Sequence, residues 1–205
     1  MDPDEALQDA AADGDLEAAR LFVENGADPR ADDSLALVLA AQEGHLEVVR
    51  YLIAQGADAA VEDHLPMRLA AEQGWLNVVR HLVETGADAA ARDNYAAGMA
   101  VQNGHLDVVR YLAAHGADLH ARGDAMVVVA AHAGHLDVLR YLADQDLDLS
   151  AEEGGALVAA AESGHLEIVE FLLAHGVDAR SRAGAALDAA ASIGRDDIVA
   201  ALRRG

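Results

Sequence analysis

The sequence predicts an all-α solenoid of seven helix-turn-helix repeats, each 30 residues long. Three observations lead to this prediction: glycine recurs every 30 residues, apolar residues follow a helical period inside each repeat, and alanine dominates the apolar residues. Alanine-rich faces suit helices that approach each other closely over many similar contacts. We therefore expect stacked repeats with one continuous core rather than one thick globular core.

Two glycine series define the repeats. The first has a member in every repeat: Gly14, Gly44, Gly74, Gly104, Gly134, Gly164 and Gly194. The second comprises Gly26, Gly56, Gly86, Gly116 and Gly176, and Asp146 interrupts it. We predict a single repeat domain over residues 1–205, with an N-terminal cap repeat (1–30), internal repeats (31–180) and a C-terminal cap repeat (181–205). Equivalent positions are named below as columns, numbered after the repeat 31–60.

Each repeat is expected to hold two short helices. In the second helix, Leu46, Val49 and Leu52 fall on one helical stripe. This helix is expected to end at Gly56, where glycine suits a left-handed residue. The first helix is predicted to begin at column 34, because most residues there are preferred N-cap types: Ser34, His64, Asn94, Asp124, Gly154 and Gly184. With this phase, columns 37, 39, 40 and 41 point inward.

The segment Gly44-His45-Leu46-Glu47-Val48-Val49-Arg50-Tyr51-Leu52, followed by Gly56-Ala57-Asp58, resembles the second half of an ankyrin repeat. The match extends over essentially the whole chain. The chain departs from the family in two ways: its period is shorter than the usual value of about 33 residues, and no repeat contains the Thr-Pro-Leu-His tetrapeptide. Asp93-Asn94-Tyr95-Ala96 and the Ala-Ala-x-x-Gly-His that follows resemble the short ankyrin repeats of large DNA viruses and some protists. The resemblance implies helix pairs in a curved array that binds proteins, with truncated hairpin fingers that leave more of the contact to the helices.

Columns 35, 38 and 42 vary between repeats and are spaced i, i+3 and i+7, so they are expected to share one face of the first helix. Several of these residues are apolar, which is typical of an interaction site rather than a solvated stripe. The alternative is that the loop of the next repeat covers part of the face. The predicted partner-binding residues on this concave face are Leu35, Val38, Leu65, Arg68, Tyr95, Met99, Gln102, Val128, His132 and Val158.

The charge of −22 argues against nucleic acid and anionic membranes as partners, because phosphate binding depends on clustered Lys and Arg. It favours a basic protein partner. The chain has no cysteine, no apolar run long enough to span a bilayer and an acidic first segment. We therefore expect a cytoplasmic monomer.

Histidine invites a catalytic or metal-binding hypothesis, but the pattern opposes both. His45, His105, His135 and His165 occupy the recurrent Gly-His position and are interpreted as structural. His132 and His135 have a plausible ligand spacing, yet Gly134 interrupts the helix between them. Because nucleophile elbows and phosphate loops are also absent from the sequence, we predict no catalytic residue, no metal and no cofactor.

The sequence thus favours a scaffold that captures a protein or peptide on the first-helix face, and not an enzyme. Two alternatives remain open. The chain could act as an acidic decoy of a nucleic-acid-binding protein through charge alone. It could also bind a small molecule, or act on one, in a pocket at the centre of the groove.

Overall fold

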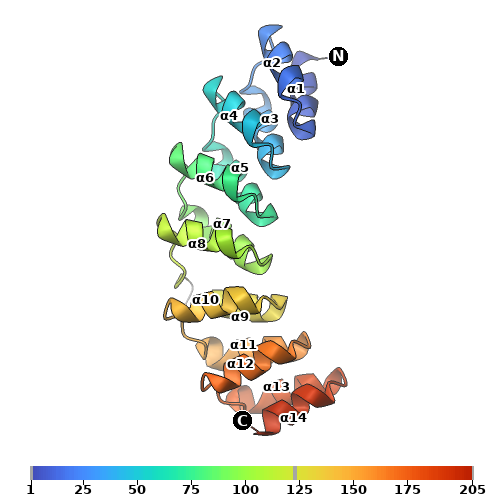
Figure 1. Cartoon of the computed structure of the whole chain (residues 1–205), viewed down its shortest axis with the longest axis vertical. Coiled ribbons are helices and arrows are strands. Elements are labelled where there is room, and N and C mark those ends of the chain that lie inside the picture. Colours follow the sequence, from blue (N-terminus) through green and yellow to red (C-terminus); the bar gives the residue numbers. More distant parts are fainter. Residues whose placement is uncertain (1, 122–123, 205) are drawn as a thin grey trace. The chain divides into compact units, whose positions relative to one another are not determined.

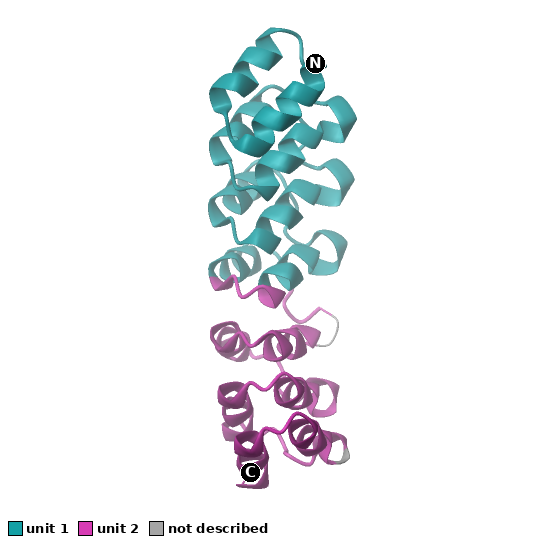
Figure 2. Ribbon diagram, turned by 90° about the vertical axis from the view of Figure 1, so that its right-hand side faces the viewer, with its two compact units in different colours: residues 1–100, 107–117 teal, residues 101–106, 118–205 magenta. Residues whose placement is uncertain are grey.

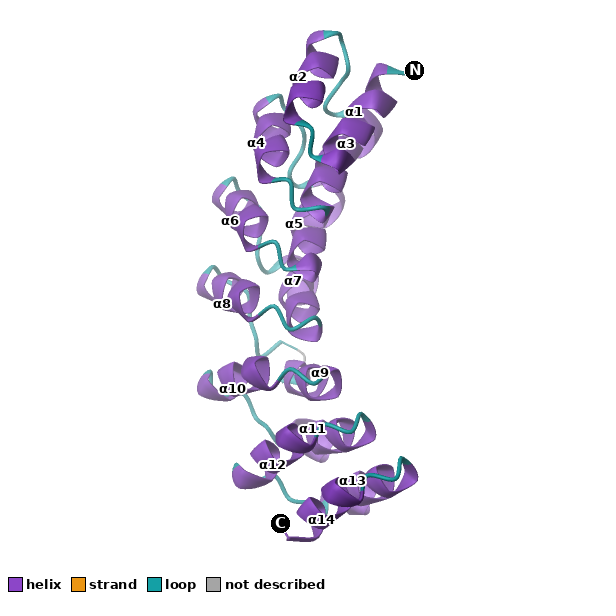
Figure 3. Cartoon of the chain, turned by 45° about the vertical axis from the view of Figure 1, so that its right-hand side comes forward, coloured by secondary structure: helices purple, strands orange, loops and turns teal. Residues whose placement is uncertain are grey.

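The fold is described from a computed structural model over residues 2–121 and 124–204. Within these residues the chain forms fourteen helices, arranged as helix pairs, and no strand (Figures 1 and 3). The first helices of the pairs are α1 (Pro3–Asp13), α3 (Ala31–Gln42), α5 (Val61–Gln73), α7 (Ala91–Gln102), α9 (Ala125–Ala133), α11 (Ala151–Glu162) and α13 (Ser181–Ser192). The second helices are α2 (Leu16–Glu24), α4 (Leu46–Ala54), α6 (Leu76–Glu84), α8 (Leu106–Ala114), α10 (Leu136–Asp144), α12 (Leu166–Ala174) and α14 (Asp196–Arg204). The predicted all-α helix-turn-helix solenoid is confirmed.

The helices group into two compact units (Figure 2). Unit 1 comprises residues 1–100 and 107–117, and unit 2 comprises residues 101–106 and 118–205. In unit 1, α3 packs between α1 and α5, and α4 packs between α2 and α6. In unit 2, α11 packs between α9 and α13, and α12 packs on α14. Stacking between like helices therefore builds each unit, as expected for repeats that cannot bury their apolar faces alone.

Helix α1 has a well-formed N-terminal cap. Asp2 is the N-cap residue, and its carboxylate accepts a hydrogen bond from the backbone N–H of Asp4 at 3.1 Å. Pro3 follows at the first helical position, where its missing N–H removes no intrahelical bond.

Each junction between repeats uses two local motifs. At Gly56 the backbone is left-handed (φ +97°), and the N–H of Ala57 donates to Leu52 O at 3.0 Å, which closes the helix end. Asp58 then accepts a hydrogen bond on its carboxylate from the backbone N–H of Ala60 at 2.8 Å. This Asx-type turn recurs at the aspartate of the other junctions and redirects the chain toward the next repeat.

Asp146 replaces a junction glycine without changing the turn. Its backbone is left-handed (φ +62°), and the N–H of Leu147 donates to Leu142 O at 3.2 Å, as at the glycine junctions. Asp is one of the few residue types that tolerate this conformation. The junction therefore keeps its hydrogen-bond pattern.

The shortened finger is a single left-handed turn. Asp32, Asp33 and Ser34 have φ values of +48°, +55° and +60°, and the Ser34 N–H donates to Arg30 O at 3.2 Å. Three consecutive left-handed residues also precede the right-handed part of α5, α7 and α11. Non-glycine residues pay about 1–2 kcal/mol each for this conformation. Three left-handed residues thus take the place of the longer hairpin finger.

This turn corrects the predicted N-cap role of column 34. Ser34 and Asp124 lie in the left-handed region, and neither side chain makes a capping hydrogen bond, although Asp124 stands directly before α9. Instead, Ser34 Oγ accepts a hydrogen bond from the N–H of Asp58 at 2.9 Å, and Asp124 Oδ2 accepts one from the N–H of Asp148 at 2.8 Å. These side chains link the two ends of a repeat. Sequence reasoning missed this role because Asn, Asp and Gly favour both N-caps and left-handed turns.

Relief of strain in this turn is testable. Asp33→Gly is expected to raise the free energy of unfolding by about 0.5–1 kcal/mol, because glycine adopts positive φ without a Cβ penalty. Urea denaturation of both proteins measures the difference. Glu43→Gly is the matched control: it removes the same charge at an ordinary right-handed residue (φ −87°) and should destabilise. Equal effects of the two substitutions would show that the left-handed turn holds no strain.

The outer faces of the second helices carry arginines stacked over aromatic rings of the next repeat. The guanidinium carbon lies 5.6 Å from the ring centroid for Arg20 and Tyr51, and 5.5 Å for Arg80 and Tyr111. Arg140 and Phe171 form the same contact in unit 2, at 5.9 Å. Such stacks contribute about 0.5–1 kcal/mol each at exposed sites. They join neighbouring repeats on the face opposite to the first helices.

His81 occupies the aromatic column of this series. Burial and then the charge of Arg50 lower its pKa from the ordinary value of 6.5. Because the folded state favours the neutral ring, the unfolded chain binds the proton more readily, and stability falls as the pH drops below about 6.5. We expect His81→Tyr to stabilise the protein at every pH, through an Arg50 stack, and to do so more at pH 5 than at pH 8. Thermal unfolding at the two pH values measures this, and an identical gain at both would contradict it.

Candidate functional site

The accessible face of α3 differs from the predicted one by one column. Columns 36, 37, 40 and 41 are buried in α3, and so is column 38, where Val38 is 7% exposed. Columns 35, 39, 42 and 43 keep accessible surface. At about 100° per residue these four columns share one arc of the helix. In α3, column 39, which was expected to point inward, therefore belongs to the accessible face, and column 38 does not. In α9, however, column 38 keeps accessible surface, since Val128 is only half-buried.

The ten predicted partner-binding residues divide into three groups. Val38, Arg68 and Val158 are buried, each 7% exposed, so their side chains offer almost no contact surface. The half-buried residues are Leu35, Leu65, Met99 and Val128. The exposed residues are Tyr95, Gln102 and His132. Leu39 and Leu69, which sequence reasoning assigned to the interior, are half-buried and lie on the accessible face.

Packing explains why column 38 is covered in α3. In unit 1, α3 has a neighbouring first helix on each side. Together with the paired second helix, these two neighbours cover a wider arc of α3 than the single apolar stripe of an ordinary amphipathic helix. Column 38 lies at the edge of that arc. The spacing of apolar residues could not reveal how wide the covered arc is. Columns 38 and 39 are both apolar in α3, so the sequence does not tell which of them is buried.

Large apolar residues on the accessible face concentrate in unit 1. There, α3, α5 and α7 each present two of them, at columns 35 and 39. We call these residues the unit 1 strip: Leu35, Leu39, Leu65, Leu69, Tyr95 and Met99. The same columns carry smaller residues in unit 2: Ala125, Val129, Gly155, Ala159, Ala185 and Ala189.

Tyr95 is the most prominent member of the strip. Its side chain is 44% exposed, and the guanidinium carbon of Arg68 lies 5.4 Å from the centroid of its ring. Arg68 Nη2 donates a hydrogen bond to Glu62 O at 3.1 Å, whereas its Nε is buried without a hydrogen-bond partner. Arg68 thus supports the Tyr95 ring from beneath. Sequence reasoning selected both residues but not their stacking.

Carboxylates border the strip at both helix ends. The left-handed turns at the start of α5 and α7 contribute Glu62, Asp63 and Asp93, and the turn at the start of α3 contributes Asp32 and Asp33; all five are exposed. One arginine lies among them, since Arg92 Nε is 3.9 Å from Asp63 Oδ2. Glu43 and Glu72 lie at the opposite ends of α3 and α5. The surroundings of the apolar strip are therefore strongly negative.

The recurrent Gly-His histidines have structural roles. His45 Nε2 donates to Ala12 O at 3.0 Å, and His135 Nε2 donates to Gln102 O at 3.1 Å; His165 bonds His132 O in the same way. Trp75 replaces the histidine in the third repeat, and its Nε1 donates to Gln42 O at 2.8 Å. These rings hold successive repeats together. His132 Nδ1 bonds Ser163 Oγ at 3.0 Å, so His132 and His135 have separate partners.

Within the described part of the chain, no three acidic or histidine side chains gather in a way that could hold a metal ion. The helices there are also too short or too polar to cross a bilayer. Neither observation identifies a site.

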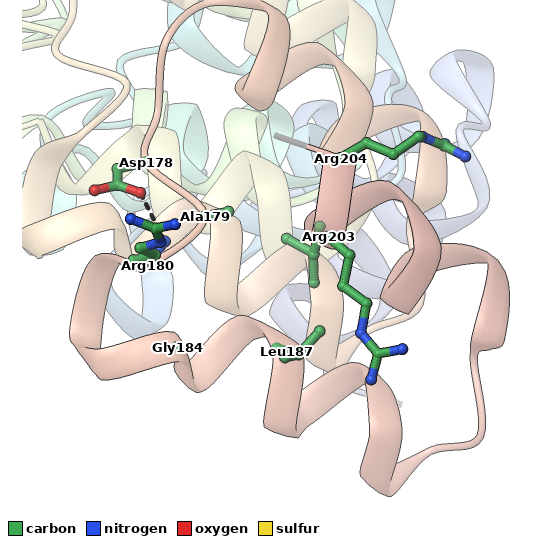
Figure 4. Close-up of a pocket in the computed structure, with 8 residues that line it drawn as sticks. Asp178, Ala179, Arg180, Gly184, Leu187, Arg203 and Arg204 are labelled. Atoms are coloured by element: carbon green, nitrogen blue, oxygen red, sulfur yellow. Dashed lines mark hydrogen bonds between the residues drawn. The ribbon is translucent and has the colours of Figure 1, made fainter.

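Two cavities lie beside junction loops rather than on the strip. One, of about 580 Å³, is lined by residues that include Arg30, Ile53 and Thr85. The other, of about 430 Å³, lies in unit 2, with Arg180 beside Asp178 on one side and Arg203 and Arg204 on the other (Figure 4). None of the ten predicted partner-binding residues lines either cavity. These cavities therefore give no support to a small-molecule pocket at the centre of the groove.

Comparison with known families agrees with the geometry. A family model for ankyrin repeats, which spans three repeat copies, matches residues 7–93, 67–153 and 127–205. A search of curated proteins found no relative that matches the chain.

Proposed function

Because the chain belongs to the ankyrin-repeat family, whose members are generally protein-binding modules, we propose that it captures a partner protein on the accessible face of its first helices. The observation that carries this proposal is the row of large apolar side chains that remain accessible at columns 35 and 39. Exposed apolar surface that is rimmed by polar residues is typical of interaction sites. Tyrosine is among the residues that most often dominate the binding energy.

Among the residues predicted from sequence, we propose direct contact by Leu35, Leu65, Tyr95, Met99, Gln102, Val128 and His132. Val38, Arg68 and Val158 are covered, so their contribution is to hold the neighbouring residues in place. The charge of −22 favours a basic partner and fast, salt-sensitive association. We further propose that the protein binds as a monomer in the cytoplasm, since a chain without cysteine needs no oxidising compartment.

Two other functions predict different behaviour. An acidic decoy would bind through charge alone, so its affinity would collapse with salt and would ignore the loss of one aromatic side chain. An enzyme or small-molecule binder requires an enclosed cavity with convergent polar groups. The accessible row of apolar side chains favours protein binding over both alternatives.

The proposal is tested by selecting binders from a random peptide library against the wild-type protein. Affinities are then measured for Tyr95→Ala and Val128→Glu, with Tyr51→Ala as the control, because Tyr51 lies on the outer face in the arginine stack. We expect Tyr95→Ala to weaken binding at least tenfold and Tyr51→Ala to leave it unchanged, while circular dichroism shows that all variants stay folded. If Tyr95→Ala and Val128→Glu both leave every selected affinity unchanged, the first-helix face is not the binding site.

A further inference from the structure

Two independent features coincide on unit 1: the strip of large apolar side chains and the dense border of carboxylates. In unit 2 the strip columns hold alanine, glycine or valine. Of its finger turns, the one at the start of α11 carries Glu152 and Glu153, and Arg182 Nη2 lies 3.7 Å from Glu152 Oε2. Unit 2 therefore has carboxylates but no strip of large apolar side chains. Only unit 1 combines an apolar strip with a border of carboxylates.

The dimensions of the unit 1 strip match a helix. Residues at i and i+4 on one helix are about 5–6 Å apart, so the strip is two side chains wide. Packed helices lie about 8–10 Å apart, so three of them give a length of roughly 20 Å. A partner helix of about 14 residues covers that length, and its apolar stripe is two side chains wide. An extended strand directs alternate side chains to opposite faces and would present only a single row.

The charges select which helix fits. The strip is bordered by carboxylates at the finger turns on one edge, and by Glu43 and Glu72 on the other. An amphipathic helix places its polar residues on both flanks of the apolar stripe. Basic residues on these flanks would meet carboxylates on both edges, whereas acidic flanks would be repelled.

Resting on the proposed function, we propose that the unit 1 strip is a docking site for a basic amphipathic helix of another protein. The helix lies across α3, α5 and α7 with its apolar stripe on the strip. Tyr95, fixed over the buried guanidinium of Arg68, is the main anchor, at the α7 end of the strip. The helix itself contacts unit 1 alone, and Val128 and His132 of unit 2 are left to other parts of the partner protein.

The test uses three synthetic 18-residue peptides, with binding measured by fluorescence anisotropy. The first contains leucine and arginine at amphipathic helical spacing, the second has the same composition in scrambled order, and the third replaces arginine with glutamate. We expect the first to bind and to gain helical circular dichroism on binding. The scrambled peptide should bind at least tenfold more weakly, and the acidic peptide should not bind.

Protein variants locate the contact. Tyr95→Ala and Leu69→Glu should each lower the affinity for the first peptide at least tenfold. Val129→Glu, in the matching column of unit 2, should leave that affinity unchanged. Since Tyr95 is 44% exposed, the tyrosine variant retains a folded chain even if Leu69→Glu does not. Equal binding of the scrambled peptide would show that charge alone attracts the ligand. An equal loss with Val129→Glu would overturn the restriction to unit 1.

The two proposals fail in different ways. If the designed helix does not bind but library-selected peptides of other chemistry bind and depend on Tyr95, the protein-binding function stands and the basic-helix inference is wrong. If neither peptide set depends on Tyr95, both proposals fall.

Discussion

The substitution Gly44→Ala is expected to lower the free energy of unfolding by about 3 kcal/mol. Gly44 has a left-handed backbone (φ +83°), which already costs a residue with a Cβ atom about 1 kcal/mol. The added Cβ would also lie 2.5 Å from Cδ2 and 2.7 Å from Cε2 of Trp75. The indole cannot simply swing aside, because its Nε1 donates to Gln42 O at 2.8 Å. The substitution therefore disturbs the contact that joins two successive repeats.

Gly86→Ala separates these two effects. Gly86 is also left-handed (φ +111°), but an added Cβ would meet no atom within 4 Å. Gly86→Ala should therefore lower the free energy of unfolding only by the cost of a left-handed backbone at alanine, about 1 kcal/mol. Urea denaturation of both variants measures the difference, provided that the m-values agree with wild type. Equal losses at Gly44 and Gly86 would mean that the close approach of Trp75 contributes nothing.

Ala100→Leu should cost about 1–3 kcal/mol through overpacking. Ala100 lies on the inner side of α7 and is completely buried. Small residues here let neighbouring first helices approach closely, and three additional carbon atoms can be accommodated only by displacing a helix or straining a rotamer. Leucine has nearly the same helix propensity as alanine, so the loss would report packing and not helix formation.

The control for this prediction is Ala114→Leu, an alanine-to-leucine change at an exposed position of α8. We expect it to leave the thermal midpoint of unfolding unchanged while Ala100→Leu lowers it. A neutral result at Ala100 would indicate that the first helices are more loosely packed than their burial implies.

Local signals account for what could be predicted from the sequence. The glycine spacing identified the helix ends, because a left-handed residue after a helix is a local requirement. The Asp2 cap and the apolar stripe of Leu46, Val49 and Leu52 are equally local, and both correspond to observed helices. The interpretation of the Gly-His histidines as structural also agrees with their hydrogen bonds to the preceding repeat.

The finger turn was harder to predict for a specific reason. Its residues must tolerate positive φ, yet Glu62, Arg92 and Glu152 are not typical of that region. The signal that could have revealed the turn was the three-residue shortening together with Asn94, Gly154 and Gly184 in column 34. The same residue types also favour N-caps, so composition alone could not decide between the two.

By itself, the sequence determined the repeat number, the order of helices and the negative charge, since these depend on residue spacing and composition. The tertiary structure decided which apolar columns stay accessible. Val38 and Leu39 are adjacent and both apolar, but only the neighbouring helices determine that Val38 is covered and Leu39 is not. Likewise, Arg68 and Tyr95 come from different repeats, and they form one stack because α5 and α7 bring them together. The width of the buried arc is a property of the stacked helices, and no single repeat encodes it.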